Sequence, residues 1–248
     1  MQLTDKRILV TGGASGIGRA LVDALLARGS HVGVLDCDEK ALAALPAGPL
    51  LWTRPCDVAD AAGVDAAVSA FAAETGGLDG VVNNAARVHN QLLVGLGAKG
   101  LQRYDAAAFR RVVDVTLLGV FHVTVAAAEI MVRKRIRGVI VNVGSIAAAG
   151  NLGQSAYSAA KAGVHALTAT WAKELGGFGI RVAGIAPGFT RTPGALATMS
   201  EQVTADWVRR TPLRRMADPT EIVDGILFLL GNDFCHGRML EVDGGLRL

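Results

Sequence analysis

Hydrophobic and polar positions follow two patterns that alternate along the whole chain. Short runs rich in β-branched residues are typical of buried strands, and they are separated by Ala/Leu-rich stretches in which apolar residues recur at every third or fourth position. The first pattern predicts strands at 7–11, 31–36, 50–58, 78–84, 138–143, 180–187 and 238–245. The second predicts helices at 16–29, 38–45, 60–76, 105–135, 155–177 and 219–231. Strands and helices in strict alternation predict a parallel sheet with right-handed crossovers and helices on both faces.

Length and composition indicate one domain. The chain has 248 residues, of which 51% are hydrophobic, so it can bury one large core. It has no Pro/Gly/Ser-rich linker and no repeat period. We therefore expect a single α/β domain over residues 1–248, a Rossmann fold with a doubly wound, seven-stranded parallel sheet flanked by helices.

Charge and cysteine content exclude several classes of partner. The formal net charge is +3 and the longest basic run is "RKR" at 133–135, which argues against a nucleic-acid footprint. The three cysteines are odd in number and lack C-x-x-C spacing, which argues against disulfides and a metal site and favours a cytoplasmic location. The start of the chain lacks the apolar core of a signal peptide, and polar residues interrupt the uncharged stretch 138–160, so we expect no membrane span.

A glycine-rich turn after the first strand predicts a dinucleotide site. In "ILVTGGASGIGRALVDALLARG", Gly12 would allow the tight turn, Gly16 the approach of the backbone to a pyrophosphate, and Gly18 close packing of helix on strand. The spacing is G-x-x-x-G-x-G rather than the common G-x-G-x-x-G, and a purely structural turn is the alternative. Ser15 and Ile17, within the same turn, belong to the predicted cofactor site.

Carboxylates and amides at the following strand ends extend this prediction. Asp36 ends the second strand, where its carboxylate would accept hydrogen bonds from the adenosine ribose. Because this carboxylate would repel a 2′-phosphate, it favours NAD over NADP. The alternative is that Asp36 serves only as a turn residue. Asp57 could accept from the adenine amino group and Val58 could present its backbone, although Asp57 is also a helix-start signal. The pair Asn83 and Asn84 could tie strand ends together beside the cofactor, or be plain turn residues.

Five segments resemble one known family. "TGGASGIG", "NNAA", "NVGS", "YSAAK" and "APGFTRT" occur in this order over nearly the whole chain, which resembles the short-chain dehydrogenase/reductase family. The resemblance implies a Rossmann fold, often in a tetramer, and hydride transfer between a nicotinamide and a carbonyl or alcohol. It also implies that Ala85 of "NNAA" belongs to the cofactor site. Together with Asp36, this makes NAD the expected cofactor.

The resemblance implies a catalytic set on one helix face and the preceding strand end. Tyr157 would be the acid/base, and Lys161, four residues later, would favour the phenolate together with the oxidised nicotinamide and bind its ribose. Ser145 would hydrogen-bond the substrate oxygen. A surface helix with a snorkelling lysine is the alternative that the spacing alone leaves open.

The segment after the sixth strand is expected to close the site. By resemblance, Pro187 and Gly188 close over the nicotinamide, while the Thr190 backbone and the Thr192 hydroxyl meet its carboxamide. Residues 189–215 would then form a mobile substrate lid.

Two departures from the family pattern leave alternatives open. Ala86 replaces a glycine, and Thr116 stands where relatives usually have a catalytic asparagine that anchors a relay water. We therefore expect an NAD-dependent alcohol dehydrogenase or ketone reductase with Thr116 in its catalytic set. An NADPH-dependent 3-oxoacyl-carrier-protein reductase and a catalytically weak NAD-binding regulator are the alternatives.

Two further expectations concern substrate and assembly. The segment 86–109 resembles that of NAD-dependent type 2 3-hydroxyacyl-CoA dehydrogenases, in which case Lys99 and Arg103 could meet a CoA phosphate; as ordinary solvated side chains they need no role. The helices at 105–135 and 155–177 carry apolar residues on more than one side, which predicts a homotetramer or homodimer. These residues include Phe121, Val125, Leu167 and Trp171.

Overall fold

A seven-stranded, fully parallel sheet forms the centre of the molecule in a computed structural model that describes residues 1–97 and 100–248. Its strands lie in the order β3-β2-β1-β4-β7-β8-β9. Their bounds are β1 Arg7–Thr11, β2 His31–Asp36, β3 Leu51–Pro55, β4 Gly80–Asn83, β7 Val139–Val143, β8 Arg181–Pro187 and β9 Met239–Val242. The predicted doubly wound Rossmann fold is confirmed, and the order reverses between β1 and β4, where such folds bind their ligands.

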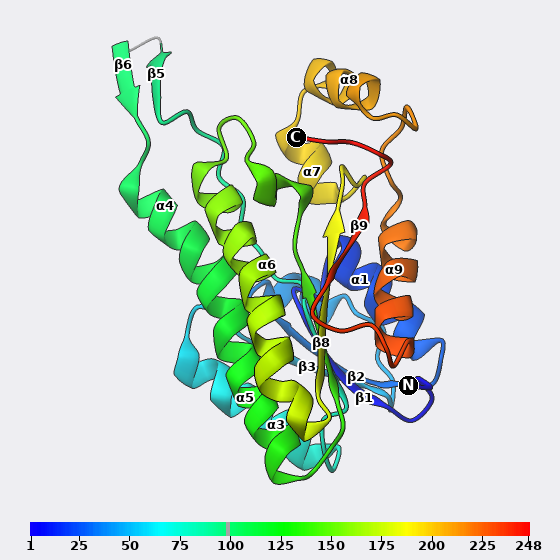
Figure 1. The fold of residues 1–248 in the computed structure, drawn as a ribbon. Helices are drawn as coiled ribbons and strands as arrows, with labels where there is room; N and C mark the ends of the chain where they lie inside the picture. The colour runs from blue at the N-terminus through cyan, green and yellow to red at the C-terminus, as the bar shows by residue number, and fades with distance from the viewer. Residues whose placement is uncertain (98–99) are drawn as a thin grey trace.

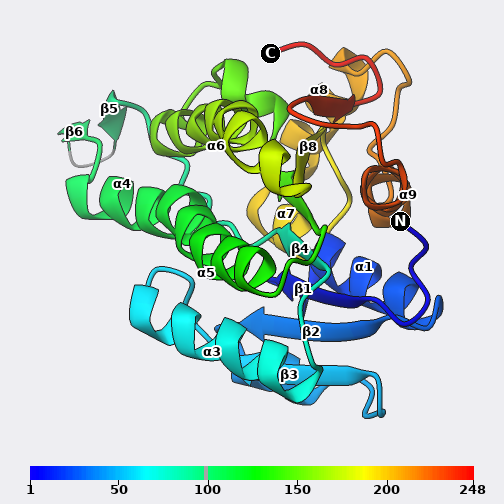
Figure 2. The same ribbon diagram turned by 60° about the horizontal axis from the view of Figure 1, so that its bottom comes forward.

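Helices cover both faces of the sheet (Figures 1 and 2). One core cluster joins the sheet to α1 (Gly16–Leu26) and α9 (Pro219–Gly231). The other joins it to α3 (Ala61–Glu74), α5 (Gly119–Arg133) and α6 (Ser155–Leu175). Because both faces are covered, the central strands are apolar at nearly every position, which is why their sequences show continuous β-branched runs rather than alternation.

The predicted helix at 105–135 is continuous but changes its hydrogen bonding. It runs as α4 (Ala106–Val113), a π-helical turn (Asp114–Leu118) and α5, so residue 116 lies in the π-helical part. The span Ala106–Arg133 is long and apolar enough to cross a membrane by length and composition, with a hydropathy of 1.9, and half of that window is buried inside the protein. A core helix that packs on both sides has the same properties.

The structure also has two pairs of elements outside the predicted pattern and one short predicted helix. A two-stranded antiparallel hairpin, β5 (Val94–Gly97) and β6 (Gly100–Arg103), projects from the body beside α4 (Figure 1). The short helix α2 (Glu39–Ala43) follows β2, close to its prediction. Two helices, α7 (Pro193–Thr198) and α8 (Glu201–Arg210), occupy the segment expected to form a lid.

The prediction of exposed apolar residues on α5 and α6 holds only in part. The side chains of Phe121 and Val125 on α5 are 45% and 46% exposed. On α6, Leu167 is partly buried, and Trp171 is only 7% exposed because it packs into the core between α6 and the sheet. Trp171 therefore packs within the subunit and adds no apolar side chain to the surface that a partner could cover.

Candidate active site

A cleft of about 700 Å³ lies at the carboxyl ends of the strands, beside α7. It gathers predicted site residues from four separate segments of the chain. These are Ile17, Ser145, Tyr157, Lys161, Pro187, Gly188, Thr190 and Thr192. The parallel sheet explains this, because every strand delivers its following loop to the same edge.

The glycine turn has the geometry of a phosphate cradle. Gly12 and Gly16 have φ angles of +63° and +54°, which favour glycine. A Cβ at Gly18 would lie 2.0 Å from the Gly12 carbonyl oxygen, so only glycine fits where α1 packs on the turn. Ser15 is the N-cap of α1 and its exposed side chain makes no cap bond. The backbone therefore comes close to any ligand at the helix N-terminus, and the residues fit a pyrophosphate.

Asp36 lies at the end of β2 next to this turn. One carboxylate oxygen accepts from the Ala14 N–H at 3.0 Å and the other from the Asp38 N–H at 3.1 Å. Burial together with the negative charges of Asp36, Asp57 and Asp38 raises the pKa of the Cys37 thiol. The end of β2 is therefore a region of negative potential, which disfavours a further anion there.

The next predicted pair, Asp57 and Val58, contacts the continuous helix formed by α4 and α5. Asp57 accepts from the Ala59 N–H at 3.0 Å and forms a 2.7 Å ion pair with Arg111 of α4. Hydrogen bonds to Ala59 and Arg111 outweigh burial and lower the pKa of Asp57. Val58 is buried and its carbonyl lies 3.0 Å from His122 Nδ1. These contacts leave Asp57 partly exposed, while the Val58 carbonyl already has a partner.

The two asparagines of "NNAA" point in different directions. Asn83 is buried and donates to Asn142 Oδ1 at 2.8 Å and to Thr124 Oγ1 at 3.0 Å, inside the protein. Asn84 lines the cleft and donates to the carbonyls of Thr11 and Gly12 at 3.1 and 2.9 Å. Asn84 thus connects β4 to the glycine turn, whereas the side chain of Asn83 cross-links the sheet to α5.

Ala85 extends the connection to the glycine turn. Its backbone N–H donates to the Thr11 hydroxyl at 3.0 Å. A Cβ at Gly12 would lie 2.9 Å from its Cα. This close contact is the physical reason why the turn needs glycine at position 12.

Tyr157 and Lys161 lie one helical turn apart on α6 and line the cleft together. The Lys161 ammonium nitrogen lies 5.6 Å from the centre of the Tyr157 ring. It donates to the Val143 carbonyl at 2.5 Å and is 1% exposed, so it is not a snorkelling surface lysine. Burial lowers the pKa of Lys161 to about 7.

In the protein alone, the pKa of Tyr157 moves in the direction opposite to the expected one. Burial raises it above the ordinary value, and hydrogen bonding to Ser145 offsets this only in part. The physical reason is that burial penalises the charged phenolate, and this penalty outweighs the hydrogen bond to Ser145. The chain by itself therefore favours the neutral phenol.

Ser145 is held from both sides by backbone contacts. Its hydroxyl accepts from the Ala147 N–H at 3.1 Å and so caps a 3₁₀ turn (Ile146–Ala149). Its backbone N–H donates to Nε2 of His165, one turn after Lys161 on α6, at 3.4 Å. His165 was not predicted as a site residue, because a lone histidine on a helix gives no signal of what it faces.

The segment after β8 covers the cleft. Gly188 donates its N–H to the Val242 carbonyl at 2.9 Å, and a Cβ there would lie 2.6 Å from Asp243, so only glycine fits. Thr190 is buried and donates to the Gly188 carbonyl at 3.1 Å, while Thr192 is the N-cap of α7. Phe189 then stacks on Trp207 of α8 with ring centres 4.2 Å apart.

Thr116 lies behind the cleft rather than in its lining. It is completely buried, and its hydroxyl donates to the Arg87 carbonyl at 3.2 Å and accepts from the Arg87 N–H at 3.0 Å. Arg87 lies between Ala86 and Val88, which both line the cleft. The hydroxyl thus fixes the loop after β4, and its single proton is already donated.

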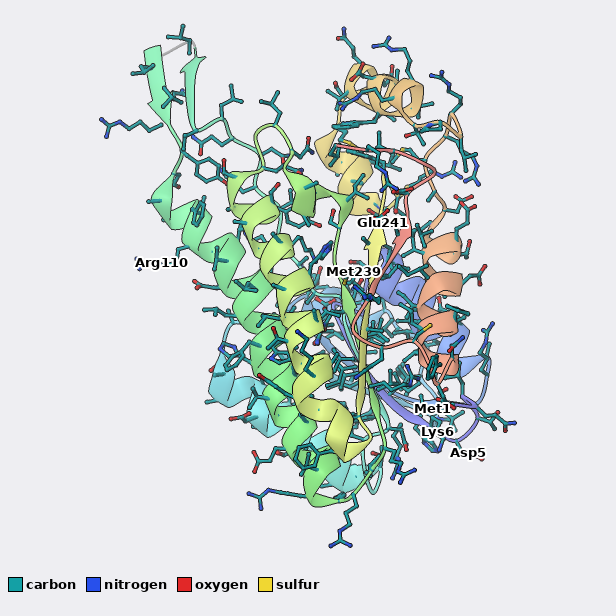
Figure 3. All side chains as sticks on the ribbon, viewed as in Figure 1. Met1, Asp5, Lys6, Arg110, Met239 and Glu241 are labelled. Atoms are coloured by element: carbon teal, nitrogen blue, oxygen red, sulfur yellow. The ribbon has the colours of Figure 1, made fainter. Side chains whose placement is uncertain are left out.

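A larger hollow, of about 1270 Å³, lies at the opposite edge of the sheet, around Met1 and Lys6 (Figure 3). Of its acidic side chains, Asp79 is paired with Arg7 at 2.5 Å and Asp233 with the Met1 amino group at 2.9 Å. Its Arg181 donates to the carbonyls of Leu229 and Leu230. These charged groups already have partners at the ends of strands and helices. Among residues 1–97 and 100–248, no group of three or more metal-ligating side chains is present.

Comparison with known proteins gives full-length matches. Residues 12–247 match the family described as enoyl-(acyl carrier protein) reductase. The chain is 36% identical to sorbitol-6-phosphate 2-dehydrogenase of Klebsiella pneumoniae, covering 99% of this chain and 97% of that protein. It is 36% identical to a 3-oxoacyl-(acyl-carrier-protein) reductase of Thermotoga maritima, covering 99% of each. The crystal structure of levodione reductase matches with a TM-score of 0.88, at 31% identity over 98% of this chain and 97% of that one.

Proposed function

Because the chain belongs to the short-chain dehydrogenase/reductase family, whose members use a nicotinamide cofactor to interconvert alcohols and ketones, we propose that it is an NAD(H)-dependent oxidoreductase for a secondary alcohol and its ketone. One observation carries the proposal: Ser145, Tyr157 and Lys161 line the same cleft, next to the loop that follows β8. The glycine turn and Asp36 lie at the adjoining strand ends and fit the phosphates and ribose.

Each of the three side chains has a separate task in this proposal. Tyr157 gives a proton to the ketone oxygen or takes it from the alcohol. Ser145 donates a hydrogen bond to the same oxygen and stabilises charge that develops on it. Lys161, whose ammonium is fixed on the Val143 carbonyl, lies close enough to the Tyr157 ring to bias its proton equilibrium.

Because the pKa of Tyr157 is raised, the phenolate forms in the cleft only where a nearby positive charge stabilises it. A neutral phenol is the form needed to protonate a ketone, and the protein alone favours it. Alcohol oxidation needs the phenolate, and the protein alone does not favour that form. When bound, the nicotinamide accepts or supplies the hydride, and its oxidised form adds the positive charge that favours the phenolate.

The preference for NAD rests on the end of β2. Asp36 presents a carboxylate there, and the effect of Asp36, Asp38 and Asp57 on the Cys37 thiol marks the region as negative. A 2′-phosphate would add like charge. The alternative, an NADPH-dependent 3-oxoacyl-carrier-protein reductase, requires this repulsion to be overcome.

Assembly and location are part of the same proposal. Phe121 and Val125 leave an apolar strip on α5 that a second copy of the chain would cover, which supports a homotetramer or homodimer. Residues 189–215 would act as the substrate lid. The free thiols of Cys37, Cys56 and Cys235 and the small net charge support a cytoplasmic enzyme that binds neither nucleic acid nor membrane.

The test is Tyr157→Phe, which keeps the ring and removes the proposed proton donor. We expect the rate of NADH oxidation with a ketone substrate to fall by about 10² to 10⁴. NADH binding, followed by its fluorescence, should persist because the glycine turn and Asp36 are untouched. Retained turnover would show that another group is the acid, and a wild-type protein that binds NADH but reduces no ketone would favour a regulator.

A further inference from the structure

One wall of the cleft consists of uncharged hydrogen-bonding side chains that the catalytic proposal does not use. Asn90 comes from the loop after β4, while Asn151 and Gln154 come from the loop before α6, and all three line the cleft. Gln154 precedes Tyr157 by three residues in "GQSAY". The wall therefore stands next to the reacting group.

The structure fixes this wall without a ligand. Gln154 donates through Nε2 to Asn90 Oδ1 at 3.0 Å and accepts at Oε1 from Asn151 Nδ2 at 3.0 Å. The two loops are also joined by the Gln91 N–H, which donates to the Gly153 carbonyl at 2.8 Å. Gln154 thus holds both asparagines in place.

Each asparagine keeps one hydrogen-bonding group for a ligand. Within residues 1–97 and 100–248, Asn90 Nδ2 and Asn151 Oδ1 have no hydrogen-bond partner in the protein. The first is a donor and the second an acceptor. A hydroxyl group can bond both, whereas a carbonyl oxygen can only accept and so bonds Asn90 Nδ2 alone.

The charges around the wall exclude an anionic substrate group. Lys161 is the only lysine or arginine among the described residues that line the cleft, and no aspartate or glutamate lines it. The Lys161 ammonium is already fixed on the Val143 carbonyl. Arg110, on the nearby helix α4, projects away from the molecule (Figure 3). A carboxylate or phosphate inside the cleft would therefore lose water without gaining a free counter-ion.

We infer that the substrate is an uncharged carbonyl compound with a second neutral oxygen. This oxygen accepts from Asn90 Nδ2, and where it belongs to a hydroxyl group it also donates to Asn151 Oδ1; Gln154 positions both asparagines. This inference rests on the proposed function, because it assumes that the reacting carbonyl meets Tyr157. The second oxygen could belong to a small dione or hydroxyketone, or to the thioester carbonyl of an acyl group. Each source offers the wall a neutral oxygen that accepts from Asn90. Of the two residues expected to meet a CoA phosphate, Lys99 lies outside the described residues, and Arg103 is exposed at the end of β6.

The experiment compares matched ketones by NADH oxidation. The set is cyclohexanone, cyclohexane-1,4-dione, the anion 4-oxocyclohexanecarboxylate and the uncharged acetoacetyl thioester of N-acetylcysteamine. We expect kcat/KM for the dione or the thioester to exceed that for cyclohexanone and for the keto acid by at least tenfold. The better of the two identifies the source of the second oxygen. A keto acid that equals or exceeds both would overturn the inference.

Variants then tie the preference to the wall. Gln154→Leu should reduce the ratio of kcat/KM for the preferred substrate over cyclohexanone at least fivefold, mainly through KM. Gln102→Leu, the same change on the exposed strand β6, should leave the ratio unaltered. Asn90→Lys should raise activity on the keto acid at least tenfold by supplying a cation at the rim. An unchanged ratio in Gln154→Leu, with NADH binding retained as proof of folding, would refute the role of the wall.

The two hypotheses fail in different ways. If wild type reduces none of the four compounds and Tyr157→Phe behaves identically, the proposed function itself fails. If all four are reduced through Tyr157 without preference for a second neutral oxygen, only the present inference fails.

Discussion

Replacing Thr116 by valine separates a structural role of its hydroxyl from a role in proton transfer. Valine has nearly the same shape, so the change removes the hydroxyl and leaves the packing of the π-helical turn. In the structure this hydroxyl makes both of its hydrogen bonds to the backbone of Arg87, at 3.0 and 3.2 Å. The two residues are 29 positions apart, so the contact ties the loop after β4 to the π-helical turn.

The size of the effect follows from these two bonds. Thr116→Val leaves the N–H and C=O groups of Arg87 without their partner at a partly buried position, which costs about 1 to 3 kcal/mol. For a chain of this size, each kcal/mol lowers Tm by about 2–4 °C. Because Ala86 and Val88 line the cleft on either side of Arg87, a looser loop should also raise KM for the ketone. We expect kcat to change by less than about tenfold.

Urea denaturation and steady-state NADH oxidation measure the two effects separately. Thr116→Ser is the matched control: it loses a buried methyl group, worth about 1 kcal/mol, but keeps both hydrogen bonds, so its KM should equal that of wild type. A Thr116→Val protein with unchanged stability and KM, but with kcat reduced more than tenfold, would refute this reasoning and assign the hydroxyl to proton transfer. A Thr116→Asn protein with kcat raised tenfold or more would instead show that the native relay is broken.

Three further predictions follow from burial and charge. Because burial lowers the pKa of Lys161 from 10.5 to about 7, the native state binds fewer protons than the unfolded chain between these pH values, and the free energy of unfolding should rise with pH across that window. Urea denaturation from pH 7 to 9 should show a smaller rise in Lys161→Met, and equal slopes would contradict the assignment. The kcat/KM with NAD should exceed that with NADP at least tenfold, and Asp36→Ala should lower this ratio. Equal kcat/KM with both cofactors in wild type would contradict the role of Asp36. Light scattering should give a multiple of the 25.6 kDa chain mass, and a single-chain mass at micromolar concentration would count against the apolar strip on α5.

The sheet and its helices were predictable because nearly every strand and helix carries its own apolar pattern in the sequence. Each central strand is buried on both faces, so its whole sequence carries the pattern, and each crossover helix has an apolar side. The hairpin of β5 and β6 was missed for the opposite reason. Leu96 and Leu101 on its two strands are 88% and 70% exposed, so no alternation between buried and exposed positions marks it. The π-helical turn gave no signal, because its apolar spacing matches that of the α-helices on either side.

The asparagine pair of "NNAA" shows where prediction of the site stops. Sequence placed both amides at the end of β4, but successive strand residues point to opposite sides. Only the structure shows that Asn83 turns inward to Asn142, its partner in strand register, and that Asn84 reaches the glycine turn. Prediction from spacing can therefore locate a site residue on an element without assigning the task of its side chain.

His165 makes a contact in the site that no sequence motif predicts. It lies one helical turn after Lys161, and its Nε2 accepts from the Ser145 N–H, so α6 supports two parts of the catalytic set. A Cβ at position 144 would lie 2.4 Å from the same nitrogen, which means that Gly144 is required for the histidine to reach Ser145. Burial and the nearby Lys161 lower the pKa of His165, which keeps the ring neutral and able to accept. The glycine before Ser145 and the histidine after Lys161 are thus one structural unit, although 20 residues separate Ser145 from His165 in the chain.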